Sequence, residues 1–129
     1  MRTLRVGIAS YEQMKARTIA IARGKYKPAA DEPKVWFTSA ESFARVLSDR
    51  NRALLGIIVE SGPESLARLA ELTGRKKSNL SRTLRTMERY GFVQLSHGAR
   101  GSVIPRVPYQ KISLTLPLLK PVRQGTEAA

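Results

Sequence analysis

Two short amphipathic segments on either side of a Thr-Gly pair constrain the fold more than any other feature of the chain. Before the pair, apolar residues recur at helical spacing: Leu66, Leu69, Ala70 and Leu72. After it, Leu80, Leu84 and Met87 follow the i, i+4, i+7 pattern of a helix with one buried side. Gly74 supplies the left-handed backbone conformation that ends the first helix. The pattern predicts two helices and a tight turn over residues 63–91.

A glycine-rich turn follows directly after these helices. Residues 92–96 and 102–107 alternate as two strands, and residues 97–101 form the tip between them. Pro105 and Pro108 restrict the returning strand to an edge or a short pairing. The sequence therefore predicts a β-hairpin, which would be the wing of a winged helix-turn-helix.

The N-terminal third predicts a strand and then a helix. Residues 4–9 alternate as a short strand, and Ser10 with Gln13 has capping-box spacing, so we expect a helix from Tyr11 to Gly24. Its apolar positions are Met14, Ile19 and Ile21, and its other positions include Lys15, Arg17 and Arg23. The expected helix is amphipathic and basic.

The segment before the two central helices is less clear. Residues 25–33 are expected to be a linker, and residues 34–37 a brief extended piece. Thr38 with Glu41 repeats the capping-box spacing, which predicts a helix that continues toward Glu60. Asp49 is a second possible cap, and the pattern leaves open one helix or two with a break near Ser48. Further on, the alternation of Ile112, Leu114 and Leu116 predicts a final strand.

These elements predict an α+β fold: a winged helix-turn-helix with an N-terminal strand–helix extension and a C-terminal strand. Residues 1–33 are the extension and linker, with a role in dimerisation or partner binding. Residues 34–117 are the DNA-binding domain, and residues 118–129 a flexible tail.

The composition excludes several function classes. The chain has 23 Lys and Arg against 10 Asp and Glu, a formal charge of +13, which favours duplex DNA, RNA or an acidic protein as partner. The absence of cysteine excludes disulfides and thiolate chemistry, and His97 as the sole histidine excludes the usual zinc-ligand sets. The sequence shows neither a signal peptide nor an apolar run of about 20 residues, so we expect a cytoplasmic protein without membrane contact. No catalytic constellation or phosphate-binding glycine loop is present, so neither an enzyme nor a cofactor is expected.

The second central helix is the candidate functional element. Residues 75–89 hold six cations and one acid, Glu88, whereas a solvated helix normally mixes signs for i, i+4 pairing. The residues predicted to contact DNA are Arg75, Lys76, Lys77, Ser78, Asn79, Ser81, Arg82, Arg85 and Arg100. Among them Ser78, Asn79 and Arg82 are expected to contact base edges, because asparagine pairs with adenine and arginine with guanine. Lys76, Lys77 and Arg85 suit phosphates, and Arg100 at the hairpin tip suits the minor groove.

The run from Leu69 to Val93, with its Ser81-Arg82, Met87-Glu88 and Gly91-Phe92-Val93, resembles the helix-turn-helix of MarR-type and ArsR-type winged-helix regulators. The whole chain is similar to a group of small MarR-like DNA-binding proteins. That closer similarity is carried by three segments: the opening Leu-Arg-Val-Gly-Ile-Ala-Ser-Tyr-Glu, then Val-Trp-Phe-Thr-Ser, and Arg-Val-Pro-Tyr near the end. Members of this group are often encoded beside a small toxin-like protein, so the resemblance also implies an antitoxin.

The expected function is a sequence-specific regulator of transcription that binds double-stranded DNA, a repressor acting on a palindromic site and often on its own promoter. Because one such domain covers one half-site, a homodimer is expected, with residues 1–24 as the dimerisation element. One alternative is an antitoxin that neutralises a cognate protein toxin and regulates its own operon. A second alternative is a basic RNA-binding module.

Overall fold

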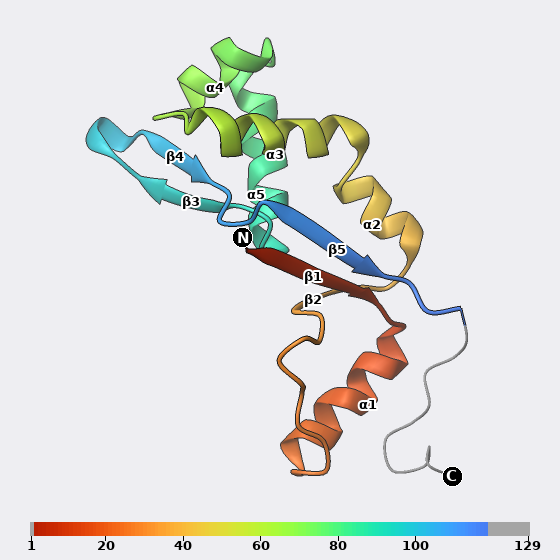
Figure 1. Cartoon of the computed structure of the whole chain (residues 1–129). Coiled ribbons are helices and arrows are strands. Elements are labelled where there is room, and N and C mark those ends of the chain that lie inside the picture. Colours follow the sequence, from red (N-terminus) through yellow and green to blue (C-terminus); the bar gives the residue numbers. More distant parts are fainter. Residues whose placement is uncertain (1, 119–129) are drawn as a thin grey trace. The chain divides into compact units, whose positions relative to one another are not determined.

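A computed structural model of the chain describes residues 2–118 (Figure 1). The predicted tail lies outside the described residues from position 119 onward. The predicted α+β class is confirmed, because the described residues form helices together with two small sheets. Among these residues, none of the helices is both long enough and apolar enough to cross a membrane.

Contacts divide the chain into two compact units. Among the described residues, unit 1 combines residues 2–3 with Ala44–Lys111, and unit 2 combines Leu4–Phe43 with residues 112–118. Helix α2 (Ala40–Val46) spans the boundary between Phe43 and Ala44. The predicted division into residues 1–33 and 34–117 separates two expected roles, partner binding and DNA binding, and it stays a prediction.

Unit 1 consists of three helices followed by a hairpin (Figure 1). The helices are α3 (Asp49–Ser61), α4 (Leu66–Thr73) and α5 (Lys77–Arg89), and the hairpin strands are β3 (Gln94–His97) and β4 (Val103–Arg106). Each helix directs an apolar side into one core, which also receives Phe92 and Val93. The buried helical residues are Leu54, Leu55, Ile58, Leu66, Leu69, Leu80, Leu84 and Met87.

The predicted stripe of α5 is confirmed. Leu80, Leu84 and Met87 are each 0% exposed. The stripe predicted for α4 is wrong at one position, because Leu72 is 37% exposed. Leu72 follows the buried Leu66 by six residues, a rotation of about 240° at 3.6 residues per turn, so it lies at the edge of the side that Leu66 and Leu69 bury.

Serine hydroxyls mark the starts of α2 and α3. The hydroxyl of Ser48 accepts the N–H of Asn51 at 3.2 Å, so α2 and α3 are separate helices and Asp49 is the first residue of α3 rather than its cap. The predicted cap at Thr38 is also wrong. The hydroxyl of Ser39 accepts the N–H of Ser42 at 3.0 Å. The N–H of Ser39 in turn donates to the Ser42 hydroxyl at 3.2 Å, so this reciprocal pair satisfies two donors that a Thr38 cap would leave open.

The hairpin forms with antiparallel pairs from Gln94 and Arg106 to His97 and Val103. Its first strand begins two residues later than predicted, because Phe92 and Val93 are buried in the core. The tip is a short 3-10 turn, Ala99–Gly101. A Cβ at Gly98 would lie 2.8 Å from both Ile104 Cδ1 and Ser102 Oγ, so a larger residue here would have to displace these two side chains.

Unit 2 is built on a three-stranded sheet of order β2-β1-β5. Its strands are β1 (Thr3–Ile8), β2 (Val35–Phe37) and β5 (Lys111–Thr115), and helix α1 (Tyr11–Ala22) connects β1 to the parallel β2 (Figure 1). The central strand buries Leu4 and Val6. Gly7 allows Trp36 to approach closely, since a Cβ there would lie 2.7 Å from Trp36 Cζ3.

Helix α1 begins as predicted but packs differently. The capping box at Ser10 is present and the helix begins at Tyr11. None of its residues is buried, and Ile19, expected on the apolar side, is 41% exposed. Arg17, expected among the outward cations, instead pairs with Glu32 at 3.1 Å and lies over the Trp36 ring at 5.3 Å. Arg17 replaces Ile19 on the packed side because it follows Met14 by three residues and precedes Ile21 by four.

Candidate functional site

The side of α5 opposite the core is the candidate functional surface. Ser78, Arg82, Arg85 and Arg89 follow one another at intervals of four, three and four residues, which places them on one face of a helix. All of them are exposed. Because Leu80, Leu84 and Met87 fix the opposite side of the helix in the core, the rotation of this basic face is determined by packing. We call these four residues the outer face of α5.

Arg89 lies on the outer face although the sequence prediction does not include it among the contact residues. Its spacing of four from Arg85 and seven from Arg82 is the signal that would have found it. Its Nη2 atom donates to Thr86 Oγ1 at 3.2 Å, which holds the guanidinium close to the helix.

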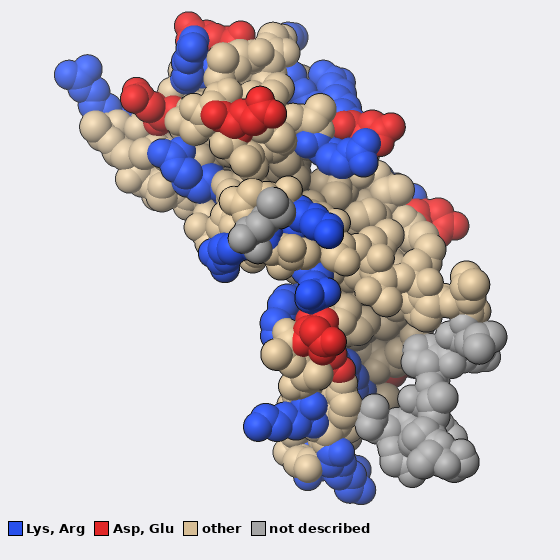
Figure 2. Space-filling view, in the orientation of Figure 1, with Lys and Arg blue, Asp and Glu red and all other residues tan. Residues whose placement is uncertain are grey.

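The arginines of the outer face form no ion pair with another described residue, although α5 carries one exposed acid, Glu88. Within residues 2–118 the ion pairs join Arg17 to Glu32, Arg52 to Asp49 and Arg68 to Glu71. None of them includes a residue of α5. Over α3 and α4, in contrast, acidic and basic side chains are interspersed (Figure 2). In unit 1, therefore, acidic and basic side chains are mixed on α3 and α4, whereas the arginines of the outer face of α5 have no acidic partner among the described residues.

Asn79 and Ser81 flank the outer face on opposite sides. Asn79 is exposed and precedes Arg82 by three residues. Ser81 is half-buried and follows Ser78 by three residues. A ligand that covers the outer face would meet the Asn79 amide directly, whereas the Ser81 hydroxyl offers it less surface.

The N-terminus of α5 has no side-chain cap. Lys76 occupies the capping position and makes no cap hydrogen bond, because a lysine side chain has donors and no acceptor. Lys76 and Lys77 are both exposed. The first-turn N–H groups and two ammonium groups are thus combined at this end of the helix, an arrangement that favours an anion.

Arg75 is the predicted contact residue whose surroundings differ most from expectation. Its Nη1 donates to Asn51 Oδ1 at 3.5 Å and its Nη2 to the carbonyl of Arg50 at 3.2 Å. Burial, and secondly the charge of Arg50, lower the pKa of Arg75 from its ordinary value. The side chain is therefore held against the start of α3 and does not project from α5.

Arg100 stands at the hairpin tip with an unusual backbone. It is exposed and has φ 58°, the left-handed region that non-glycine residues rarely adopt. A basic side chain projects from the tip of the hairpin at the left of Figure 2. The tip is closed by Gly98 N–H, which donates to the Ser102 carbonyl at 2.8 Å. The backbone thus directs a single cation away from the hairpin.

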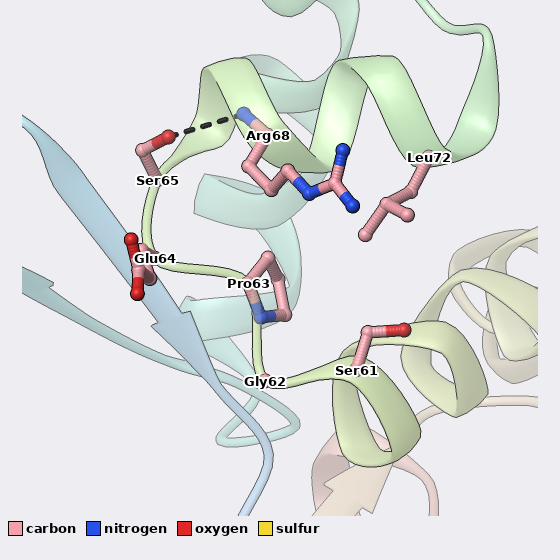
Figure 3. Close-up of a pocket in the computed structure, with 7 residues that line it drawn as sticks. All are labelled: Ser61, Gly62, Pro63, Glu64, Ser65, Arg68 and Leu72. Carbon is pink, nitrogen blue, oxygen red and sulfur yellow. Dashed lines mark hydrogen bonds between the residues drawn. The ribbon is translucent and has the colours of Figure 1, made fainter.

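A hollow beside the start of α4 is a second candidate (Figure 3). Its polar groups serve the local structure: Ser65 Oγ accepts the N–H of Arg68 at 3.1 Å, and Arg68 pairs with Glu71 at 3.3 Å. The Pro63 carbonyl accepts Arg106 Nη1 at 3.0 Å. No group of three or more His, Asp or Glu side chains in the described part of the chain is arranged to hold a metal ion. The polar groups named here are thus engaged in contacts within the chain.

The model of one protein family, HVO_A0114, matches residues 46–114. The chain therefore belongs to this family. The matched range includes α3, α4, α5 and both hairpin strands. No curated protein and no solved structure matches the chain.

Proposed function

We propose that this member of the HVO_A0114 family is a sequence-specific regulator of transcription that binds double-stranded DNA. In this proposal α3, α4 and α5 with the β3–β4 hairpin act as a winged helix-turn-helix similar to that of MarR-type and ArsR-type regulators, and α5 enters the major groove. One observation carries the proposal. The outer face of α5 presents unpaired cations and small polar groups on a helix whose rotation is fixed by three fully buried residues.

The chemistry of each position supports a role at the duplex. Arg82 suits the O6 and N7 acceptors of guanine, and the neighbouring Asn79 suits adenine. Lys76, Lys77 and Arg85 suit phosphates, since ammonium and guanidinium groups neutralise the backbone and release counterions. Arg100 suits the minor groove, where narrow A·T-rich stretches concentrate negative potential.

A homodimer is part of the proposal. A palindromic site needs two copies related by two-fold symmetry. Helix α1 supports this role because it buries none of its residues within the chain and leaves Tyr11 73% and Ile19 41% exposed. Sedimentation equilibrium of the wild-type chain and, separately, of the Tyr11→Glu variant tests the homodimer. We expect the wild-type chain to be a dimer and the variant to be a monomer. A wild-type chain that is monomeric at roughly 50 μM, about the dissociation constant of a weak homodimer, would contradict the proposed homodimer.

Selection of genomic DNA fragments on the purified protein tests the function. We expect a short symmetric motif, with affinity that falls steeply between 50 and 200 mM salt, by about 10³-fold or more if several phosphates are contacted. Structured RNA of equal length is the competitor. If RNA displaces the selected DNA at equal concentration, or if no motif is enriched, the proposed function is wrong.

The proposed repression is tested separately, with a reporter gene behind the selected site. We expect expression of the chain to lower reporter output, and an Arg82→Ala variant produced at the same level to restore it. Unchanged or increased output with the wild-type chain would contradict repression without contradicting DNA binding.

A further inference from the structure

Strand β5 forms one edge of the sheet in unit 2, and no other strand of residues 2–118 pairs with its outer side (Figure 1). The opposite edge is β2, which has only three residues and so offers little length for a further strand. Natural proteins protect an edge strand by shortness, charge or proline, because its outward N–H and C=O groups are unpaired. On β5 the lysine is the first residue and Pro117 follows the end of the strand. The stretch between them, residues 112–116, carries no such protection.

This stretch also leaves apolar side chains exposed. Ile112 and Leu114 lie on one face of β5, and Leu116 follows at the same spacing directly after the last residue of the strand. Leu114 is 38% and Leu116 is 52% exposed, whereas Leu4 on the central strand is 3% exposed. An open edge with exposed apolar residues is the kind of surface to which a further strand adds.

The chemistry of residues 112–116 is symmetric about Leu114. A hydroxyl residue lies on each side of it, Ser113 and Thr115. Outside these lie two branched apolar residues, Ile112 and Leu116. If two copies pair antiparallel with Leu114 opposite its own equivalent, hydroxyl groups oppose each other on one face and apolar side chains on the other. A two-fold axis requires a surface that is complementary to itself, and this stretch meets that requirement.

Charge favours a second copy as the occupant of this edge. Two copies of a chain with a formal charge of +13 repel each other, so they meet at least cost where charge is lowest. Residues 112–118 contain no charged side chain, whereas an acidic partner would be attracted to the cationic surfaces instead. Each Lys111 lies three positions from the centre of the pairing, which separates the two ammonium groups by roughly 20 Å along the strands. Their repulsion is screened, because the Debye length is about 8 Å at physiological ionic strength.

We propose that two copies of the chain join through β5, antiparallel and with Leu114 opposite Leu114, so that two sheets of three strands become one continuous sheet. The pairing satisfies the outward backbone groups of both edges and covers Leu114 and Leu116. The inference deepens the proposed function and rests on it for the need of a homodimer, because it names the strand through which that homodimer forms, in addition to helix α1 of the same unit.

Sedimentation equilibrium of the full chain and of L114K tests the pairing. We expect the dissociation constant of the dimer to rise by about tenfold or more in L114K, because two lysines then oppose each other at the two-fold axis. L72K is the matched control, since Leu72 is 37% exposed but lies on α4, and its dimer should be unchanged. Circular dichroism checks that both variants fold. A dimer of normal strength in L114K would overturn the inference.

A mixture of two variants tests the symmetry of the pairing. L114E should also weaken the dimer when measured alone, because two carboxylates then oppose each other. Mixing L114E with L114K should restore a dimer, since the introduced lysine of one copy opposes the introduced glutamate of the other. If both variants are monomeric alone and the mixture stays monomeric, the Leu114-centred pairing is wrong.

Cysteine substitution provides an arm that does not depend on breaking the dimer. The chain has no cysteine, so L114C carries a single thiol. Residues directly opposite each other have Cα atoms about 4.5–5.5 Å apart, within the reach of a disulfide. We expect mild oxidation to link L114C into a covalent dimer, and S113C to link far less, because its two thiols are diagonal neighbours about 7–8 Å apart. No linkage in L114C, or equal linkage in S113C, would overturn the inference even if L114K failed to fold.

The inference and the proposed function fail differently. If L114K is monomeric but selection of genomic DNA enriches no motif, the β5 pairing stands and the proposed function falls. If a symmetric DNA motif is enriched while L114K dimerises normally and Tyr11→Glu does not, the proposed function stands and the β5 pairing falls.

Discussion

Helices α1 and α5 are almost equal in length, with 12 and 13 residues, and carry two and four cations, yet these cations are held in opposite ways. Helix α5 buries three residues completely and leaves its outer cations unpaired. Helix α1 buries none and places its central cation, Arg17, against Glu32 and the Trp36 ring. The comparison teaches that a basic helix keeps its cations available for a ligand when apolar residues alone hold it in the fold.

The largest expected effect concerns what holds each helix. Leu84→Ala should lower the free energy of unfolding by about 2–5 kcal/mol, because it removes a fully buried side chain and leaves a cavity. Met14→Ala in α1 is the matched change and should cost only about 1 kcal/mol, because Met14 is half-buried. Urea unfolding followed by circular dichroism measures both. Equal losses of unfolding free energy in the two variants would contradict the statement that α5 is held by its buried apolar residues and α1 is not.

The second prediction concerns the free cations. Arg82→Ala should weaken binding to the selected DNA site by about 1–3 kcal/mol and relax specificity at one base pair, because a bidentate contact to guanine is lost. Lys15→Ala in α1 removes the same charge from an exposed position and should leave affinity almost unchanged. Anisotropy at fixed salt, with specific and random duplexes, measures both. An R82A variant with normal discrimination would show that α5 does not contact bases.

The third prediction concerns the paired cation of α1. Arg17→Ala should lower the free energy of unfolding by about 1–2 kcal/mol, because it leaves Glu32 without its partner and removes the contact with the Trp36 ring. Its side-chain exposure is 23%, compared with 72% for the paired Arg52. Arg52→Ala is therefore the control and should change stability by less than about 0.5 kcal/mol. Similar losses in the two variants, measured by thermal unfolding, would mean that the Arg17 contacts add nothing to the fold.

The smallest expected effects concern the two N-termini. Ser10→Ala removes the capping box of α1 and should cost about 1 kcal/mol of stability. Lys76→Ser supplies α5 with the cap that it lacks and should add about 0.5–1 kcal/mol. If the α5 N-terminus binds phosphate, the same variant should lower DNA affinity and reduce the salt slope by about 1. A K76S variant that gains stability at no cost in affinity would argue against that contact.

Local periodicity explains what was predictable. The positions of Leu80, Leu84 and Met87 repeat with the helical period, so the buried side of α5 and its opposite face followed from the sequence. The capping box at Ser10 was equally local. The competition between Thr38 and Ser39 was not, because both residue types cap helices and both have a partner three positions later. Which of them caps is decided by the Ser39–Ser42 hydroxyl pair, at 3.2 Å.

Contacts between residues distant in sequence explain what was missed. The hydrogen bond of Arg75 to Asn51 joins positions 24 residues apart, and that of Arg106 to Pro63 joins positions 43 apart. Neither pair carries a periodic or motif signal. The sequence alone therefore groups Arg75 with the cations at the start of α5, although its side chain is held at the start of α3. The DNA-binding role of the predicted residues stays a prediction that the experiments above test.

The order of strands in unit 2 has a consequence for biosynthesis. The sheet places β1, among the first residues made, between β2 and β5, whose residues Lys111–Thr115 leave the ribosome more than 100 positions later. Strands β1 and β2 are both made within the first 37 residues, so β1 must wait with one edge open until β5 has been made. During that interval the exposed edge of β1 is the part of the nascent chain most in need of protection from wrong partners.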